Sequence, residues 1–319
     1  MFGLTFLTAT SRTTTHRVVP FRIAKLTPLA GYAAGGFGPA LRADIDKITF
    51  PLDTKTLLIA TLSVARQTAT GFANSTVAGY TPGGYTGTYH TTINKLTFPA
   101  DTATTLSATL TNGVFAAAGF ANSGTAGYVA GGDIGPMTDA IDKIAFSADT
   151  KTTLSATLTT ARGYVAGFAN SGVAGYAAGG EDSGGNVSGI DKIAFSADTK
   201  TTLSATLTTA RTTPAGFANS GTAGYVAGGY DSAPISNIDK IAFSADTKTT
   251  LSATLTAAKN RGTGFANSGV AGYFAGGLAA ANTDLIDKIA FSADTKTTLS
   301  ATLTTARRMS AGFADSGIL

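Results

Sequence analysis

One stretch of this chain is repeated almost without change. The sequence IDKIAFSADTKTTLSATLTTA occupies residues 141–161 and again residues 190–210. It belongs to a repeat whose six copies of I-[DN]-K-[IL]-[TA]-F start at Ile45, Ile93, Ile141, Ile190, Ile238 and Ile286. The steps between these starts are 48, 48, 49, 48 and 48 residues. A period of about 40 to 50 residues with several strand-like segments predicts one blade of a β-propeller per copy.

Each copy contains four candidate strands, called a to d in chain order. In the third copy, strand a is GFANSG (119–124) and strand b is AGYVAGG (126–132). A variable segment follows, and then strand c, IDKIAF (141–146). SADTKT (147–152) has the composition of a hairpin turn, and TLSATLTTA (153–161) alternates apolar residues with hydroxyls as strand d. A single blade cannot cover both of its faces, so blades must pack on each other.

The count of strands predicts how the ring closes. The first b-c-d set begins near Gly31 without a strand a, and a last strand a, GFADSG, begins at Gly312 with nothing after it to pair with. We therefore expect an all-β, six-bladed propeller over residues 29–319, whose first blade is completed by the C-terminal strand. The alternative is a seven-bladed ring that uses residues 4–6 and 13–19 as degraded strands. Residues 1–28 lie outside the repeat; they are basic, and we expect either an arm that anchors the protein to a partner assembly or an extra strand packed on the outside of the ring.

The repeat resembles the kelch repeat in three features. Strand b ends in a Gly doublet, such as Gly131–Gly132, and a Tyr stands three residues before each doublet, as Tyr128 does. A basic residue follows strand d in most copies, as Arg162 does. The Trp that is usual in kelch strand d is missing, and Leu154 and its equivalents lie in that region. The resemblance implies a propeller that binds a partner through its loops. Galactose oxidase is a kelch-type enzyme, but its chemistry uses a Cys–Tyr crosslink, which this chain cannot form.

Composition argues against catalysis. The 319 residues include no Cys, two His and a single Glu, so clusters for metal binding or acid–base chemistry are scarce. We expect no enzyme, no cofactor and no metal. The net charge of +4 is spread along the repeats, which does not favour nucleic-acid binding. No apolar stretch is long enough for a transmembrane helix, and the start lacks the features of a secretory signal.

Three features of the repeat have both a structural and a functional interpretation. The Phe of strand a, such as Phe120, is expected to be blade-to-blade core, and the alternative is the lining of a channel. The Asn after it, such as Asn122, is expected to be a turn residue, and the alternative is an axial ion site. The Asp–Lys pair of strand c, such as Asp142–Lys143, is expected to form ion pairs between blades or to lie at a solvated edge, and the alternative is a site for an acidic or basic ligand.

Variation between copies is confined to one face of the predicted ring. The a–b and c–d turns hardly change, whereas the b–c and d–a segments share few letters. We expect the variable face to be the binding face, with the b–c segments around the mouth of the pore. Tyr side chains suit sugar rings or interface anchors. The candidate ligand-binding or partner-binding residues are Tyr85, Tyr89, His90, Asp133, Glu181, Asp182, Asn186, Tyr230, Asp231 and Asn282.

Near-identical Thr/Ala/Gly-rich repeats of this kind are similar to those of phage virion and tail-fibre proteins. The resemblance implies a virion component that contacts a host-surface glycan or receptor, or another virion protein, as a monomer or homo-oligomer. The alternative is a bacterial surface or intracellular scaffold that binds a protein partner.

Overall fold

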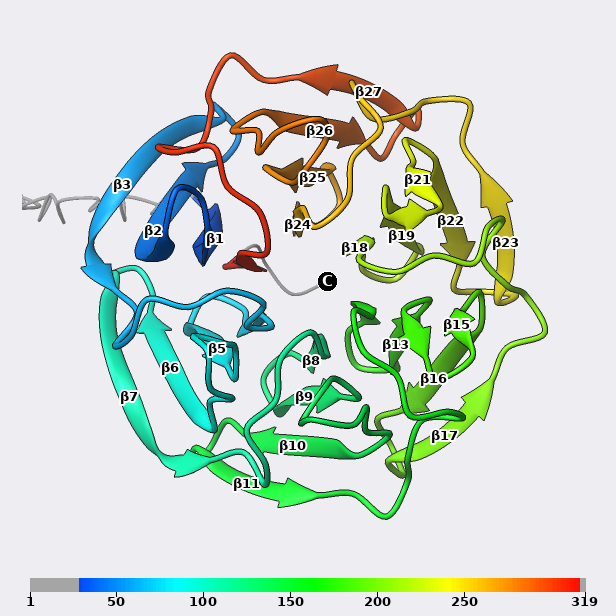
Figure 1. The fold of residues 1–319 in the computed structure, drawn as a ribbon. Coiled ribbons are helices and arrows are strands. Elements are labelled where there is room, and N and C mark those ends of the chain that lie inside the picture. The colour runs from blue at the N-terminus through cyan, green and yellow to red at the C-terminus, as the bar shows by residue number, and fades with distance from the viewer. Residues whose placement is uncertain (1–28, 316–319) are drawn as a thin grey trace, which may run out of the picture.

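The computed structural model describes residues 29–315. They form six four-stranded antiparallel sheets, arranged as blades around a central axis (Figure 1). No helix occurs in residues 29–315. The predicted arm over residues 1–28 lies outside the described residues.

Each blade has one strand of each kind, from the axis outward. The strands nearest the axis are β28 (Ala311–Ala314), β4 (Phe72–Asn74), β8 (Ala118–Asn122), β12 (Ala166–Asn170), β18 (Ala215–Asn219) and β24 (Thr263–Asn267). The second strands are β1 (Ala30–Phe37), β5 (Ala78–Pro82), β9 (Ala126–Ala130), β13 (Ala174–Ala178), β19 (Ala223–Ala227) and β25 (Ala271–Ala275). The third strands are β2 (Leu41–Thr49), β6 (Thr92–Thr97), β10 (Ile141–Ala145), β16 (Ile190–Ala194), β22 (Ile238–Ala242) and β26 (Ile286–Ala290). The outermost strands are β3 (Thr54–Thr61), β7 (Thr102–Thr109), β11 (Thr150–Thr153), β17 (Thr199–Thr202), β23 (Thr247–Thr250) and β27 (Thr295–Thr298).

The ring closes through the C-terminal strand, as the strand count predicts. β28 pairs with β1, with Phe313 opposite Tyr32, and completes blade 1 (Figure 1). Blade 6 contacts blade 1 directly: the Tyr273 hydroxyl of blade 6 donates to Asp53 Oδ1 of blade 1 at 2.7 Å. The ring is therefore complete with six blades, and the seven-bladed alternative is wrong.

The outermost strand differs from its prediction in blades 3 to 6. In blade 3 it covers Thr150–Thr153, whereas the sequence pattern placed it at residues 153–161. The turn before it is shorter than expected, because Asp149 adopts a left-handed backbone (φ 51°) and brings Thr150 opposite Ala145. The rest of the predicted strand runs as irregular chain that still buries Leu158.

Aromatic stacks join neighbouring blades and form the core. Tyr80 is fully buried between Phe72 of its own blade and Phe146 of the next, with ring centroids 5.5 and 5.1 Å apart. A Cβ on Gly127 would lie 1.9 Å from the Phe72 ring, so only glycine allows this close approach. The repeated Phe is therefore blade-to-blade core, as predicted.

Polar side chains also bridge each pair of blades. The Asp of each c–d turn accepts two bonds from the preceding blade: Asp198 accepts from the Tyr128 hydroxyl (2.9 Å) and from Lys143 Nζ (2.6 Å). These inter-blade ion pairs are Lys47–Asp101, Lys95–Asp149, Lys143–Asp198, Lys192–Asp246, Lys240–Asp294 and Lys288–Asp53. They confirm the prediction for the lysine of the Asp–Lys pair.

A second, buried bridge uses the basic residue after the outermost strand. Arg211 is fully buried and donates to Asp239 at 2.7 Å and to the Val226 carbonyl at 3.2 Å, both in the next blade. Blade 2 has Asn94 in place of this aspartate, so burial without a counter-charge lowers the pKa of Arg66 to about 10. The polar residues that define the repeat thus join neighbouring blades through hydrogen bonds and ion pairs.

Candidate binding face

The b–c and d–a segments lie on one face of the ring, here called the loop face; the a–b and c–d turns form the opposite turn face. On the loop face, one backbone contact between neighbouring segments recurs in every blade although the residue types differ. The first residue of each d–a segment pairs with the first residue of a b–c segment. These pairs are Gln67–Tyr85, Phe115–Asp133, Gly163–Glu181, Thr212–Tyr230, Asn260–Leu278 and Arg308–Phe37. In blades 4 and 5 the b–c segments form the short hairpins β14 (Glu181–Asp182) with β15 (Gly185–Asn186), and β20 (Tyr230–Asp231) with β21 (Ala233–Pro234).

The second residue of each d–a segment forms a closed ring around the pore. This mouth ring consists of Thr68, Ala116, Tyr164, Thr213, Arg261 and Met309. The backbone N–H of each member donates to the carbonyl of the member before it, and Thr68 donates to Met309, with N···O distances of 2.6 to 3.1 Å. Six peptide groups therefore circle the mouth and fix the position of six side chains.

All six members of the mouth ring have a left-handed backbone, with φ between +54° and +58°. Glycine adopts this conformation without cost, whereas a β-branched or bulky residue there is unusual. Strain of this kind is concentrated at functional sites. No blade has glycine at this place.

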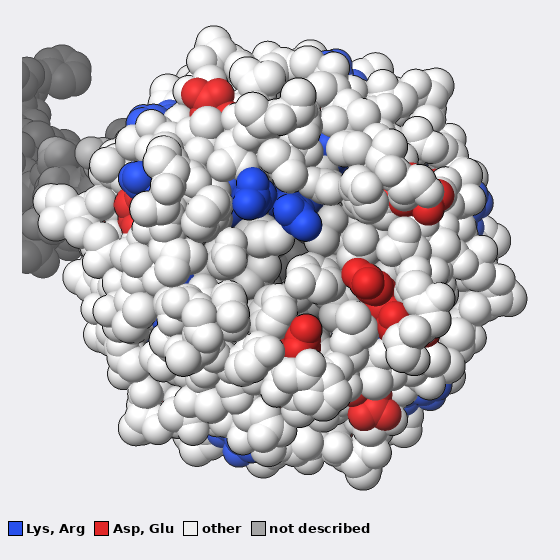
Figure 2. Space-filling model, in the orientation of Figure 1, with Lys and Arg blue, Asp and Glu red and all other residues white. Residues whose placement is uncertain are grey.

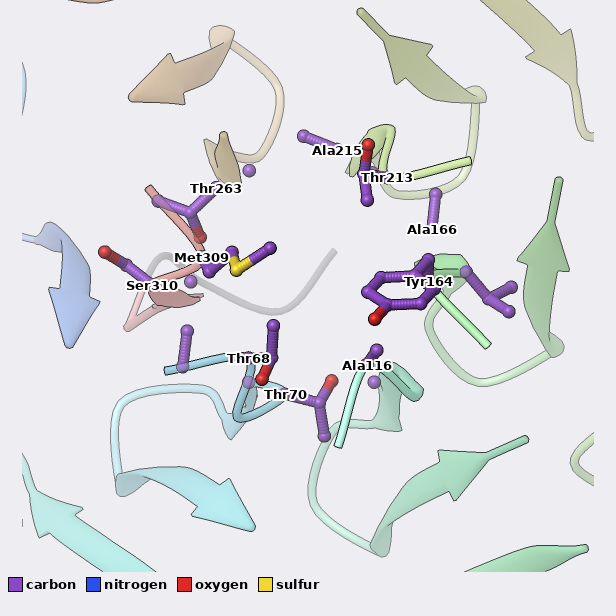
Figure 3. A pocket seen from close by; sticks show the side chains of 18 of the residues that line it. Thr68, Thr70, Ala116, Tyr164, Ala166, Thr213, Ala215, Thr263, Met309 and Ser310 are labelled. Carbon is purple, nitrogen blue, oxygen red and sulfur yellow. The ribbon is translucent and has the colours of Figure 1, made fainter. Parts of the chain in front are cut away.

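The mouth ring borders two hollows, which share Tyr164, Thr213 and Arg261 as lining residues. The first is the central opening, of about 140 Å³, lined by the d–a segments and the starts of the innermost strands. Tyr164 and Met309 extend toward it from opposite sides (Figure 3). The second, here called the lateral groove, has a volume of about 320 Å³ and lies over blades 4 to 6. It is lined by Tyr164, Glu181, Thr212, Thr213, Tyr230, Asn260, Arg261 and Leu278.

The lining corrects one prediction. The d–a segments surround the mouth of the pore, and the b–c segments stand farther out. The reason is topological: a d–a segment must cross from the outermost strand of one blade to the innermost strand of the next, so it ends beside the axis.

Charge is divided across the mouth. Figure 2 shows basic groups next to the opening on one side and acidic groups on the other. Arg308 lies over Phe37, with its guanidinium carbon 5.0 Å from the ring centroid, and donates to Asn282 Oδ1 at 3.0 Å. Burial lowers the pKa of Arg308, and repulsion from Arg261 lowers it further. Neither arginine forms an ion pair with any residue between 29 and 315, so both remain available to an anionic group.

The structure brings together several of the predicted site residues. Glu181 and Tyr230 line the lateral groove, and Tyr230 is 38% exposed. Tyr85 and Tyr89 pack on Phe115, with centroids 5.3 and 5.6 Å away, and Phe115 meets the edge of Tyr164 at 5.8 Å. An aromatic surface therefore continues from blade 2 to the mouth ring.

Tyr164 connects this surface with the charged groups. Burial raises the pKa of the Tyr164 hydroxyl, and the carboxylates of Asp133 and Glu181 raise it further, while Arg261 opposes them. The hydroxyl therefore stays protonated at neutral pH and can donate a hydrogen bond to a ligand.

The other predicted residues have structural partners. Asp133 and Asp182 each accept a bond from the backbone N–H two residues on, at 2.8 Å, and so shape their own loops. Asn186 donates to the Tyr230 carbonyl at 3.2 Å, and Asn282 holds Arg308 as described above. Asp231 is half-buried in the β20–β21 hairpin.

His90 has a local role in its loop. Its Nε2 lies 2.9 Å from the Thr86 hydroxyl, and its backbone N–H donates to the Gly84 carbonyl. Burial lowers the pKa of the His90 imidazole, and the nearby charge of Arg66 adds to this effect.

The mouth ring was not predicted from the sequence. Its signal was in the d–a segments QTAT, FAAA, GYVA, TTPA, NRGT and RMSA. The third and fourth residues of these segments are nearly all small, whereas the first and second residues both vary widely. This variation marks the start of each d–a segment, but it does not single out the second residue as the member of the ring.

On the turn face, the repeated Asn is a turn residue that also bridges blades. Asn74 Oδ1 accepts from the backbone N–H of Gly124 in the next blade at 2.9 Å, and Asn122 does the same with Gly172. These oxygens are engaged by backbone donors, which is the predicted turn role. No group of three potential metal ligands comes together within residues 29–315.

Searches of family models and of curated proteins find no match to this chain. Within the part of the chain that the structure describes, no helix is long and apolar enough to cross a membrane.

Proposed function

We propose that this protein is a non-enzymatic recognition propeller that binds a host-surface glycan through its loop face, as a component of a phage virion or tail appendage. The virion setting stands on the similarity of its repeats to those of phage virion and tail-fibre proteins. The kelch-like features support a binding role, because residues such as Tyr128 and Arg162 hold blades together and leave the loops free to vary.

The mouth ring is the observation that carries the proposal. It presents six side chains of five residue types from one rigid, hydrogen-bonded circle of backbone, at a φ that bulky residues otherwise avoid. A scaffold of this kind serves recognition, because it fixes side chains before the ligand arrives and lowers the entropy that binding must overcome.

The chemistry of the lateral groove fits a sugar, and an acidic sugar best. Tyr164 and Tyr230 offer flat apolar faces with hydroxyls, Glu181 can accept bonds from sugar hydroxyls, and Arg261 is free to bind a carboxylate. The groove volume of about 320 Å³ matches the lower end of known ligand pockets, roughly 300 Å³. Scarcity of His and Glu, and the absence of Cys, support a role without catalysis.

Adsorption of the full-length protein to host cells tests the proposal. Tyr164→Ala and Arg261→Met should each reduce binding at least about tenfold, the loss expected for one hot-spot side chain. The fold should tolerate methionine at residue 261, because Met309 occupies the same place in blade 1 with φ 58°. Lys151→Ala on an outermost strand is the matched control, since Ala103 fills that place in blade 2.

Each outcome has a distinct meaning. If the control reduces adsorption and the two ring variants do not, the binding face is wrong. If the chain binds a purified protein partner through the same ring and binds no host cell, the scaffold alternative replaces the virion role.

A further inference from the structure

Blade 6 contributes an amide and an aliphatic side chain to one wall of the lateral groove. Asn260 and Leu278 lie opposite each other and exchange both backbone hydrogen bonds, with N···O distances of 3.0 and 2.8 Å. Side chains of directly opposed residues project from the same side of the pair and are neighbours. Both residues line the groove. Each of the five other pairs contains an aromatic or an acidic residue, so this combination occurs in blade 6 alone.

The Asn260 side chain is buried, and its amide oxygen has no partner. Asn260 is 4% exposed. Its Oδ1 accepts no hydrogen bond from any group in residues 29–315. A buried polar atom without a partner is costly and is rare in folded proteins. A bound molecule that donates a hydrogen bond to this oxygen would remove the cost.

A second unpartnered oxygen lies in the same groove. Thr212 lines the groove, and its Oγ1 is buried without a partner in residues 29–315. Apart from the basic residues that bridge blades, all buried side-chain atoms of this kind in the described chain belong to the first two residues of a d–a segment. They are Thr68 Oγ1, Thr212 Oγ1, Asn260 Oδ1, Arg261 Nε and Arg308 Nε. Unsatisfied polar groups outside the bridges are therefore concentrated around the mouth.

The wall formed by Asn260 and Leu278 matches an N-acyl group. Such a group has an N–H donor, a carbonyl acceptor and a short apolar tail. The Asn260 amide carries an acceptor and a donor group side by side, so it can form two hydrogen bonds with a second amide. Leu278 offers an apolar contact for the tail. A ligand hydroxyl at this place would reach the amide but leave the Leu278 side chain without an apolar partner.

We propose that Asn260 and Leu278 form a subsite for an N-acyl group, so that the glycan bound in the lateral groove contains an N-acylated amino sugar. This inference rests on the proposed function, because it assigns a chemical class to the ligand of the same groove. The acyl group lies against the wall of blade 6, and the sugar ring packs on Tyr230. Arg261, the next residue along the chain, remains available to an acidic group of the same ligand.

Saturation-transfer NMR on the purified full-length protein tests the subsite with three probes: N-acetylglucosamine, glucose and glucuronic acid. The first two differ only in an acetamido group that replaces one hydroxyl, and glucuronic acid carries a carboxylate without an acyl group. We expect N-acetylglucosamine to bind at least about tenfold more tightly than glucose, because it satisfies the buried amide. The strongest transfer should reach its acetyl methyl protons, which lie against Leu278.

Asn260→Gly removes the amide, and the fold should accept it because Gly163 fills the same place in blade 4. This variant should reduce the affinity for N-acetylglucosamine to that for glucose and leave the affinity for glucuronic acid unchanged. Arg261→Met should have the reverse effect. Gln67→Gly is the matched control, since Gln67 fills the same place in blade 2 and lies outside the groove. It should change neither affinity.

The outcomes separate this inference from the proposed function. If glucuronic acid binds through Arg261 but N-acetylglucosamine binds no better than glucose, water satisfies the Asn260 amide and the subsite is wrong, while the glycan function keeps its support. A preference for N-acetylglucosamine that survives Asn260→Gly would place the acyl group elsewhere and also overturn the subsite. If no probe binds to the wild-type protein, both the subsite and the glycan function are contradicted.

Discussion

The two faces of the ring differ in the groups that join neighbouring blades: side chains on the turn face and backbone groups on the loop face. On the turn face, side chains join the blades: Asp198 holds Tyr128 and Lys143, and Asn122 holds the backbone of Gly172. On the loop face, backbone groups join the blades through the mouth ring and through pairs such as Phe115–Asp133. The amino acids are therefore constant on the turn face, where side chains join the blades. They vary on the loop face, where backbone groups join the blades.

This difference changes the argument for function. Constancy of the turn face has a structural cause, so it does not by itself show that variety was selected on the loop face. The left-handed backbone of the mouth ring is the stronger argument, because non-glycine side chains are kept there at a cost in strain. The comparison can be tested on each face.

The largest effect is expected from removing the strand that closes the ring. Deleting residues 311–319 removes β28, and with it the Phe313 ring that stacks on Tyr32 at 5.2 Å. Loss of one core Phe alone costs about 3 to 5 kcal/mol, so we expect loss of cooperative melting by calorimetry.

A circular permutant is the control for this deletion. Joining residue 317 to residue 29 gives GFADSGLAGY, which matches the GFANSGVAGY of residues 167–176 and restores an uninterrupted blade. It should melt cooperatively, as the full chain does. A truncated chain that also melts cooperatively would show that closure is not needed.

The next largest effect concerns the one exception among the repeated Asn residues of the turn face. Asp315 stands where five other blades have Asn, and it accepts a hydrogen bond from the Ala30 N–H. Burial raises the pKa of Asp315 from 3.8 to about 6. Between these values the folded state holds a proton that the unfolded state has lost, so stability falls as pH rises from about 4 to 6 and stays low above it.

Asp315→Asn should remove this pH dependence. A shift of about 2 pKa units corresponds to up to about 3 kcal/mol. We expect the variant to raise the free energy of unfolding by that order at pH 8, and to leave it unchanged at pH 4, in urea titrations. Asn122→Asp should have the opposite effect at pH 8. Equal stability of Asp315→Asn and the wild type at both pH values would contradict the assignment.

A smaller effect is expected in the mouth ring. Thr213 is β-branched and has φ 55°, so Thr213→Gly should relieve strain and raise the free energy of unfolding by about 1 kcal/mol. Thr201→Gly in strand β17 is the matched control and should lower it by about the same amount. If both changes destabilise equally, the ring is not strained and the argument for its function fails.

Much of the fold could be predicted because the sequence contains six copies of the same blade, which can be compared with one another. The period, the unmatched strand at Gly312 and the Phe core were all within reach of pattern reasoning. The shorter outermost strand was not, because Leu154 and Leu158 keep an alternating pattern after the ladder has ended. The mouth ring was missed because it depends on backbone conformation, which Thr68 or Arg261 does not reveal in a sequence.

Exchange of b–c segments between blades tests whether the loop face carries recognition. Residues 85–92 and 230–237 would each be replaced by DIGPMTDA, the b–c segment of residues 133–140. The backbone should accept it, because His90, Thr138 and Ile235 donate the same N–H bond to Gly84, Gly132 and Gly229.

We expect the exchanged protein to keep its melting temperature within a few degrees and to lose at least about tenfold in affinity for host cells or for the purified partner. Unchanged binding, with a loss on altering the Lys and Thr residues after Asp149, Asp198, Asp246 and Asp294 in the c–d turns, would contradict it and place recognition on the turn face.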